Sequence, residues 1–162
     1  MKKEIFDSFF NPYSKTVDKA VNVSAFWRLS DAIITEIIKR EIAPYCTDDS
    51  LIMDAGGGTG RWAVKLSEFL KGKIVIFDRS TDMLAKAREN IEHCDVSNRI
   101  DIVEGNLTNI EQFEDESINH IVSIYSPLSF IYEQIKAGQE LFRILKPGGR
   151  MLIMSHSHFN AI

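Results

Sequence analysis

The sequence predicts an α/β fold in which a doubly wound parallel sheet has the strand order 3-2-1-4-5 and helices on both faces. Short apolar runs alternate with longer segments whose apolar residues recur at helical spacing. The connections between these segments are short, which implies right-handed crossovers between parallel strands. Residues 51–60 run from an apolar strand into a glycine-rich turn that opens a helix, and this arrangement is typical of a nucleotide-type pocket.

The first helix is expected to begin at Ser30, because serine caps helix N-termini, and to end near Pro44. Its apolar stripe is made by isoleucines at positions 33, 34, 37, 38 and 42. The first strand follows from residue 51. Further strands are expected over residues 73–78, 99–106, 117–125 and 151–154, and further helices from Gly60, from Ser80 and over residues 131–145.

The first 28 residues carry an unusual number of aromatic side chains, at positions 6, 9, 10, 13, 26 and 27. This composition does not suit a linker. We therefore predict an N-terminal helical cap over residues 1–28 and a single globular unit over residues 29–162.

The turn places glycines at 56, 58 and 60, so its pattern is G-x-G-x-G. The dinucleotide fingerprint requires a glycine at position 61, where this chain has Arg61. This difference disfavours an NAD-type reductase, and Arg61 is expected to face solvent. A tight turn without any ligand is the alternative interpretation.

Together with the acid that precedes it, the turn reads Asp54-x-Gly56-x-Gly58-x-Gly60. This motif resembles the first motif of the class I S-adenosylmethionine-dependent methyltransferases. The segment L-K-P-G-G at 145–149 is also similar to a signature that precedes the fifth strand in that family. The resemblance covers about residues 30–157 and implies a Rossmann-like fold with S-adenosyl-L-methionine as the cofactor. The glycine backbone would pass alongside its ribose and methionine portions.

The resemblance also implies contacts for the rest of the cofactor. Asp54 would help to hold the amino-acid end, and Asp78 would accept hydrogen bonds from the ribose hydroxyls. Asn106 stands where relatives often have an aspartate that binds the adenine amino group, and Leu107 would offer its backbone N–H to the ring. Met83 matches the residue that packs on the adenine face. The alternatives are a solvated acid for Asp78 and helix-core packing for Met83.

Candidates for the catalytic site come from the same resemblance. Tyr13 is a candidate lid residue over the methyl group, or part of the packing of the cap. Tyr125 and Ser126 follow the fourth strand and either line the acceptor pocket or pack at the strand end. His156 and His158 follow the fifth strand, where a histidine can serve as a general base or lie on the surface. No metal is expected, because the segment after the fourth strand lacks an acid that could hold one.

The composition of the chain limits the classes of partner and the compartment that we expect. The chain has 162 residues, a net charge of -4 and 19 basic residues without a long run, so a nucleic-acid substrate is not expected. No apolar run is long enough to span a membrane and no signal peptide is evident. Its two cysteines lack metal-ligand spacing and are expected to be free thiols in the cytoplasm.

The predicted function is methyl transfer to oxygen or nitrogen of a small-molecule acceptor. A catalytically silent S-adenosylmethionine-binding subunit, or a fragment of a longer methyltransferase, is the alternative. Family members usually continue with two more strands, whereas this sequence stops soon after the fifth. An exposed edge of the fifth strand would favour a homodimer, strand exchange or a fragment.

Overall fold

The computed structural model describes residues 16, 18, 24–92 and 94–155. Its sheet has five parallel strands in the order β3-β2-β1-β4-β5, as predicted. The strands are β1 (Leu51–Ala55), β2 (Lys73–Asp78), β3 (Ile100–Glu104), β4 (Ile118–Ser123) and β5 (Leu145–Ile153). Within residues 24–155 the helices are α3 (Ala25–Glu41), α4 (Arg61–Ser67), α5 (Thr81–Glu92) and α6 (Gln134–Ile144), with 3₁₀ turns η1 (Ala43–Tyr45), η2 (Ser97–Arg99) and η3 (Pro127–Phe130).

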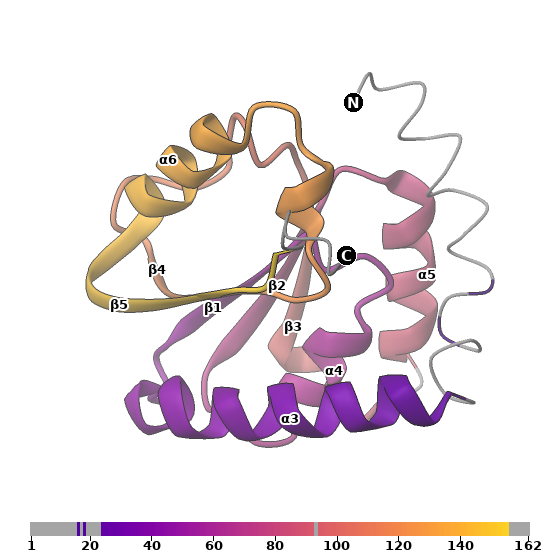
Figure 1. The fold of residues 1–162 in the computed structure, drawn as a ribbon. Helices are drawn as coiled ribbons and strands as arrows, with labels where there is room; N and C mark the ends of the chain where they lie inside the picture. The colour runs from indigo at the N-terminus through magenta and orange to yellow at the C-terminus, as the bar shows by residue number, and fades with distance from the viewer. Residues whose placement is uncertain (1–15, 17, 19–23, 93, 156–162) are drawn as a thin grey trace, which may run out of the picture.

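Helices cover both faces of the sheet, and alternate strand residues supply the two cores. Ile52 packs into a cluster with residues of α3, α4 and α5, whereas its neighbour Met53 packs into a second cluster with residues of α6. Figure 1 shows α6 on the opposite side of the sheet from α3 and α4. The apolar runs of β1 and β2 are therefore buried on both faces, as is usual for parallel strands.

The first helix begins earlier than the sequence predicts. Ser24, with an extended backbone, is the N-cap residue, and α3 runs without a break from Ala25 to Glu41. The expected start at Ser30 was wrong because the aromatic residues before it also fit the helix: Trp27 packs its ring against that of Tyr125. The helix ends three residues before Pro44, which lies in η1. It therefore crosses the expected boundary at residue 28.

The segment between β4 and α6 also differs from the prediction. β4 ends at Ser123 rather than at residue 125, because Tyr125 and Ser126 adopt left-handed backbone angles that a strand cannot contain. Pro127 then opens η3, and α6 begins only at Gln134 instead of at residue 131. β3 is likewise shorter than expected, since it spans Ile100–Glu104.

The L-K-P-G-G segment is part of β5 rather than a separate turn before it. Leu145 pairs with Ile118, and the next pair joins Arg150 to His120. Two steps along β4 thus correspond to five along β5, so three extra residues bulge out around Gly148, which has a φ of +79°. β5 lies at the end of the strand order, as predicted. Among the described residues, no helix is long and apolar enough to cross a membrane.

Candidate functional site

The glycine turn lies at the carboxyl end of β1, in the centre of the sheet. Gly56, Gly58 and Gly60 all have positive φ, at +74°, +55° and +72°. At Gly60 a side chain would also collide, because an added Cβ would lie 2.8 Å from Cδ1 of Ile76 and 3.2 Å from Cβ of Ala87. Glycine at this position therefore lets α4 start directly against β2 and α5.

Asp54, the acid at the end of β1, lies beneath the turn. Its side chain is 1% exposed, and Oδ2 has no hydrogen-bond partner among the described residues. The backbone N–H of Ala63 in α4 donates to this carboxyl group. An added Cβ on Gly57 would lie 2.8 Å from Oδ2, so the turn closes tightly over the carboxyl group.

Burial is the main cause of an unusual acidity at Asp54. It raises the pKa of the carboxyl group from 3.8 to about 7, and the nearby carboxylate of Asp78 adds to the rise. Arg61 and the N–H of Ala63 oppose it. Asp54 therefore exists in both its neutral and its charged form near neutral pH, and its Oδ2, at the carboxyl end of β1, has no hydrogen-bond partner in the described part of the chain.

Asp78 joins the turn to the end of β2. Its Oδ2 accepts a hydrogen bond from the N–H of Gly58 at 3.0 Å, and its Oδ1 accepts one from the N–H of Ser80 at 2.9 Å. Burial raises the pKa of Asp78, while these two N–H donors act in the opposite direction. Each carboxylate oxygen has further acceptor capacity, which fits the two adjacent hydroxyls of a ribose.

Met83 lies in the core and also against the glycine turn. It is 6% exposed in the core side of α5, and its sulfur lies 3.8 Å from where a Cβ on Gly58 would be. Because Gly58 has no side chain, the thioether lies against the turn itself. The structure thus brings Met83, Asp78 and the glycine turn together at the carboxyl ends of β1 and β2.

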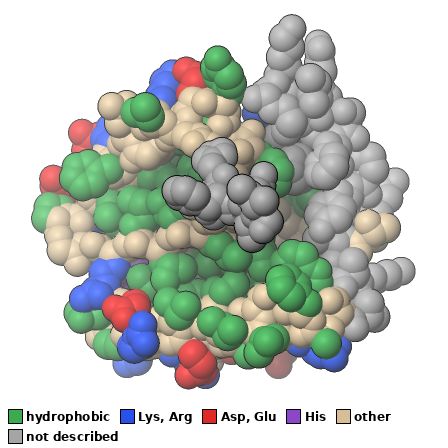
Figure 2. Space-filling model, in the orientation of Figure 1, with side chains coloured by type: hydrophobic (Ala, Val, Ile, Leu, Met, Phe, Trp, Pro, Cys, Tyr) green, Lys and Arg blue, Asp and Glu red, His purple; other side chains and the backbone are tan. Residues whose placement is uncertain are grey.

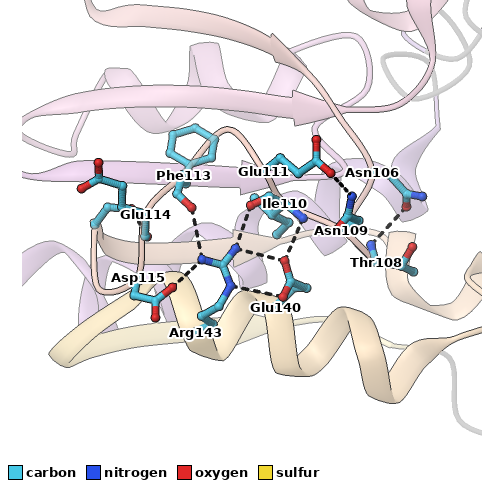
Figure 3. Close-up of polar contacts among 11 residues, drawn as sticks. Asn106, Thr108, Asn109, Ile110, Glu111, Phe113, Glu114, Asp115, Glu140 and Arg143 are labelled. Carbon is cyan, nitrogen blue, oxygen red and sulfur yellow. Dashed lines mark hydrogen bonds and ion pairs between the residues drawn. The ribbon is translucent and has the colours of Figure 1, made fainter.

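Asn106 and Leu107 follow β3 at the same edge of the sheet. The side-chain oxygen of Asn106 accepts a hydrogen bond from the N–H of Thr108 at 3.1 Å, while the side chain itself remains exposed. Leu107 is 7% exposed and packs in the core that α6 shares with the sheet. The Asn106 oxygen is thus oriented by its own loop, as Figure 3 shows.

Two side chains of α6 hold this loop in place (Figure 3). Glu140 accepts the N–H of Ile110 at 2.8 Å, and Arg143 donates to the carbonyl oxygen of Ile110 at 2.7 Å. Arg143 also contacts the carbonyl oxygen of Phe113 at 3.2 Å and the carboxylate of Asp115 at 2.7 Å. The loop that carries Asn106 is therefore bound to α6, on the face of the sheet opposite α3 and α4.

Arg61 does not face solvent, so this prediction was wrong. Its guanidinium donates to the carboxylate of Asp31 at 2.5 and 3.3 Å and is 20% exposed. The Tyr125 hydroxyl donates to the same carboxylate. Asp31 was not among the residues singled out from the sequence, and the structure places it on the buried face of α3 with Thr35 and Ile38.

Of the remaining candidates for the catalytic site, two are described by the structure and three are not. Tyr125 and Ser126 lie at the carboxyl end of β4, and Ser126 is 2% exposed. Tyr13, His156 and His158 lie outside the described residues. Within the part of the chain that is described, no group of three or more His, Cys, Asp or Glu side chains is arranged to hold a metal ion.

Comparison with known proteins agrees with this arrangement. A protein-family model described as a methyltransferase domain matches residues 52–149, which is more than half of the chain. The ubiquinone/menaquinone biosynthesis C-methyltransferase UbiE of Salmonella arizonae is 32% identical over 108 residues, covering 65% of this chain and 42% of that protein. The chain thus spans less than half the length of the curated relatives that it matches.

Solved structures show the same fold. A Methanococcus maripaludis protein assigned as an S-adenosyl-L-methionine-dependent methyltransferase superposes with a TM-score of 0.77 and 28% identity, covering 91% of this chain and 64% of that one. An arsenic(III) S-adenosylmethionine methyltransferase from Chlamydomonas reinhardtii gives a TM-score of 0.57 at 22% identity, covering 65% and 38%, and is similar in fold alone.

The residues of the site fit the cofactor of these proteins. A glycine turn without side chains, a carboxylate at the end of β2 and an unsatisfied carboxyl oxygen under the turn suit an adenosine with an amino-acid tail. S-adenosylmethionine is the cofactor of this domain family. The chain belongs to the methyltransferase-domain family and contains a class I S-adenosylmethionine-dependent methyltransferase domain.

Proposed function

We propose that this protein transfers a methyl group from S-adenosylmethionine to an oxygen or nitrogen atom of a small-molecule acceptor. The observation that carries the proposal is the hydrogen bond from Gly58 to Asp78, which connects the turn after β1 to the acid after β2. In a doubly wound sheet, ligands bind at the carboxyl ends of the strands where the order reverses. Here the order reverses between β1 and β4.

The bound cofactor supplies a methyl group on a sulfonium whose leaving group is a neutral thioether. The chain therefore mainly has to hold two molecules in line. Asp78 would orient the ribose, Asn106 and Leu107 the adenine, and the glycine turn the atoms between them. Alignment of this kind contributes up to about 7–11 kcal/mol to lowering a barrier.

In this proposal we assign the role of general base to neither of the two described candidates, Tyr125 and Ser126. Burial and the hydrogen bond to Asp31 raise the pKa of the Tyr125 hydroxyl to about 12, so it stays protonated and acts as a donor. Ser126 is buried. A general base typically contributes roughly 10²- to 10⁴-fold and is needed only for hydroxyl or protonated-amine acceptors. His156 remains our candidate for that role.

A carbon acceptor is the second candidate, and the similarity to a quinone-pathway C-methyltransferase favours it. A carbon acceptor that is already electron-rich needs alignment more than proton removal. A panel of acceptors with hydroxyl, amine and activated-carbon positions, assayed with methyl-labelled S-adenosylmethionine, distinguishes the two. Label on oxygen or nitrogen supports the first proposal, and label on carbon alone supports the second.

The catalytically silent alternative gives a different result in the same experiment. A binding subunit would take up S-adenosylhomocysteine in a calorimeter but would release no labelled product with any acceptor. Failure to bind S-adenosylhomocysteine would contradict both versions.

We propose that the acceptor is a small molecule rather than a nucleic acid, because the net charge of the chain is -4. We also propose that the protein is located in the cytoplasm.

We further propose a homodimer through the edge of β5. Figure 2 shows hydrophobic side chains gathered between α3 and β5, and a groove of about 410 Å³ lies between residues 41–42 and 150–153. Ile153 is 42% exposed beside it. Light scattering should give twice the chain mass, and a stable monomer at micromolar concentration would contradict this.

A further inference from the structure

Two consecutive residues after β4 adopt a backbone conformation that L-amino acids rarely take. Tyr125 has a φ of +61° and Ser126 a φ of +64°, although neither is glycine. The next residue, Pro127, occupies the space beside the turn, since a Cβ added to Gly56 would lie 2.3 Å from the Cβ of Pro127. Such conformations persist only where the surroundings enforce them. We call residues 125–127 the β4 corner.

The surroundings of Tyr125 come from two helices. Its ring lies edge-on to Trp27 of α3, with centroids 4.8 Å apart, and 6.3 Å from the ring of Trp62 in α4. The guanidinium of Arg61 lies 5.5 Å from the centroid of the same ring. The hydroxyl donates to Oδ1 of Asp31. The ring and the hydroxyl of Tyr125 therefore both interact with residues of α3 or α4.

Asp31 connects Arg61 to Tyr125, because its carboxylate accepts hydrogen bonds from both. It receives Arg61 on both carboxylate oxygens, and Lys65 approaches to 3.8 Å. The hydrogen bonds from Arg61 and Tyr125 outweigh burial and lower the pKa of Asp31, so it is charged at neutral pH. Arg61 directly follows the glycine turn after β1, and Tyr125 begins the β4 corner. One carboxylate on α3 therefore binds residues on both sides of the point between β1 and β4 where the strand order reverses.

We propose that Asp31 is a positioning residue for methyl transfer. By holding Arg61 and Tyr125 together, it sets the separation between the glycine turn, which binds the cofactor, and the β4 corner, which borders the acceptor. The inference rests on the proposed methyltransferase activity. It extends that activity by assigning a role to a residue of the N-terminal helix that does not itself touch the turn.

Two substitutions test this with little change in shape. Asp31→Asn keeps the size of the side chain but removes its charge toward Arg61. Tyr125→Phe keeps the ring contacts with both tryptophans and removes only the hydroxyl. Tyr45→Phe is the matched control, because Tyr45 is 50% exposed and lies in η1, before β1. The affinity for S-adenosylhomocysteine, kcat, the KM for the acceptor and the melting temperature are measured for each variant.

The chain offers a readout that does not depend on turnover. It has two tryptophans, Trp27 and Trp62, and both lie beside Tyr125. Saturation with S-adenosylhomocysteine should therefore change the tryptophan emission of the wild-type protein. If the wild type binds this ligand but methylates no acceptor, the proposed activity fails while the fluorescence comparison still decides the positioning role.

We expect both variants to bind S-adenosylhomocysteine within about threefold of the wild type, to lose at least about tenfold in kcat, and to lose the fluorescence response. Tyr45→Phe should behave as the wild type in every measurement. Wild-type kcat and fluorescence response in both variants would overturn the proposal. So would losses of affinity and melting temperature that account for the whole loss of kcat, because these would show a purely structural role.

Discussion

The backbone N–H of Gly58 donates to Oδ2 of Asp78 across 3.0 Å, and this bond joins the turn after β1 to the end of the neighbouring strand. The same carboxylate caps the start of the next segment by accepting the N–H of Ser80. Asp78 therefore has two functions in one position: it shapes the turn, and it presents carboxylate oxygens beside it.

Replacing Asp78 tests its role toward the ribose. Asp78→Ala removes an acceptor of charge-assisted hydrogen bonds, each of which contributes about 1.5–3 kcal/mol, so the affinity for S-adenosylhomocysteine should fall by roughly 10- to 100-fold. Calorimetry measures this directly. Asp82→Ala is the control, because Asp82 is exposed in the first turn of α5. Equal affinities for all three proteins would refute the ribose contact.

Gly60→Ala tests the packing of the turn. The added methyl group would lie 2.8 Å from Cδ1 of Ile76 at a φ of +72°. Left-handed backbone costs about 1–2 kcal/mol and overpacking about 1–3 kcal/mol, so the free energy of unfolding, measured by urea denaturation, should fall by roughly 2–5 kcal/mol. Gly138→Ala is the matched control. Position 138 lies in α6 with nothing within 4 Å, and alanine should stabilise the helix there by up to about 1 kcal/mol.

Asp54 predicts a dependence of stability on pH. Its pKa is raised from 3.8 to about 7 in the folded protein, so between these values the folded state holds a proton that the unfolded state has lost. The contribution of Asp54 to stability is therefore greatest below about pH 4 and falls as the pH rises toward 7, by an amount on the order of 4 kcal/mol.

The isosteric variant Asp54→Asn isolates this effect. The free energy of unfolding of the variant minus that of the wild type should increase as the pH is raised from 4.5 to 8. A constant offset caused by the amide does not affect this increase. Urea denaturation at a series of pH values measures the difference. A difference that stays constant over this range would show that Asp54 keeps an ordinary pKa.

Asn106 predicts a gain of affinity. In Asn106→Asp a carboxylate replaces the amide and can still accept the N–H of Thr108. A charged acceptor strengthens a hydrogen bond by about 1 kcal/mol, so S-adenosylhomocysteine should bind roughly 3- to 10-fold more tightly. S-inosylhomocysteine, which carries an oxygen in place of the adenine amino group, should show no gain. Equal gains for both ligands would exclude the contact with the amino group.

Much of the fold could be predicted from local patterns. Ile52 and Met53 belong to an apolar run long enough to be buried on both sides, and such runs between helical segments determine a parallel sheet. The glycines at 56, 58 and 60 form the turn between the first strand and the next helix, as predicted, and all three have positive φ. The ends of elements were less predictable: Ser30 has the chemistry of a helix cap, but it lies inside α3.

The polar contacts around the β4 corner were not predictable in the same way. Arg61 pairs with Asp31, 30 residues earlier in the chain, and an arginine after a turn carries no local sign of such a partner. Tyr125 and Ser126 have left-handed backbone angles without a glycine to indicate them. Both features depend on tertiary contacts with α3, which the spacing of residues in the sequence does not encode.

Calorimetric titration of the purified protein with S-adenosylhomocysteine is the decisive test of the site at the ends of β1 and β2. We expect saturable binding of one ligand per chain, which Asp78→Ala weakens by at least about tenfold and Asp82→Ala leaves unchanged. NAD, titrated under the same conditions, should not bind. Absence of binding by S-adenosylhomocysteine to the folded wild-type protein, or binding of the same strength in Asp78→Ala, would contradict the site described at the ends of β1 and β2.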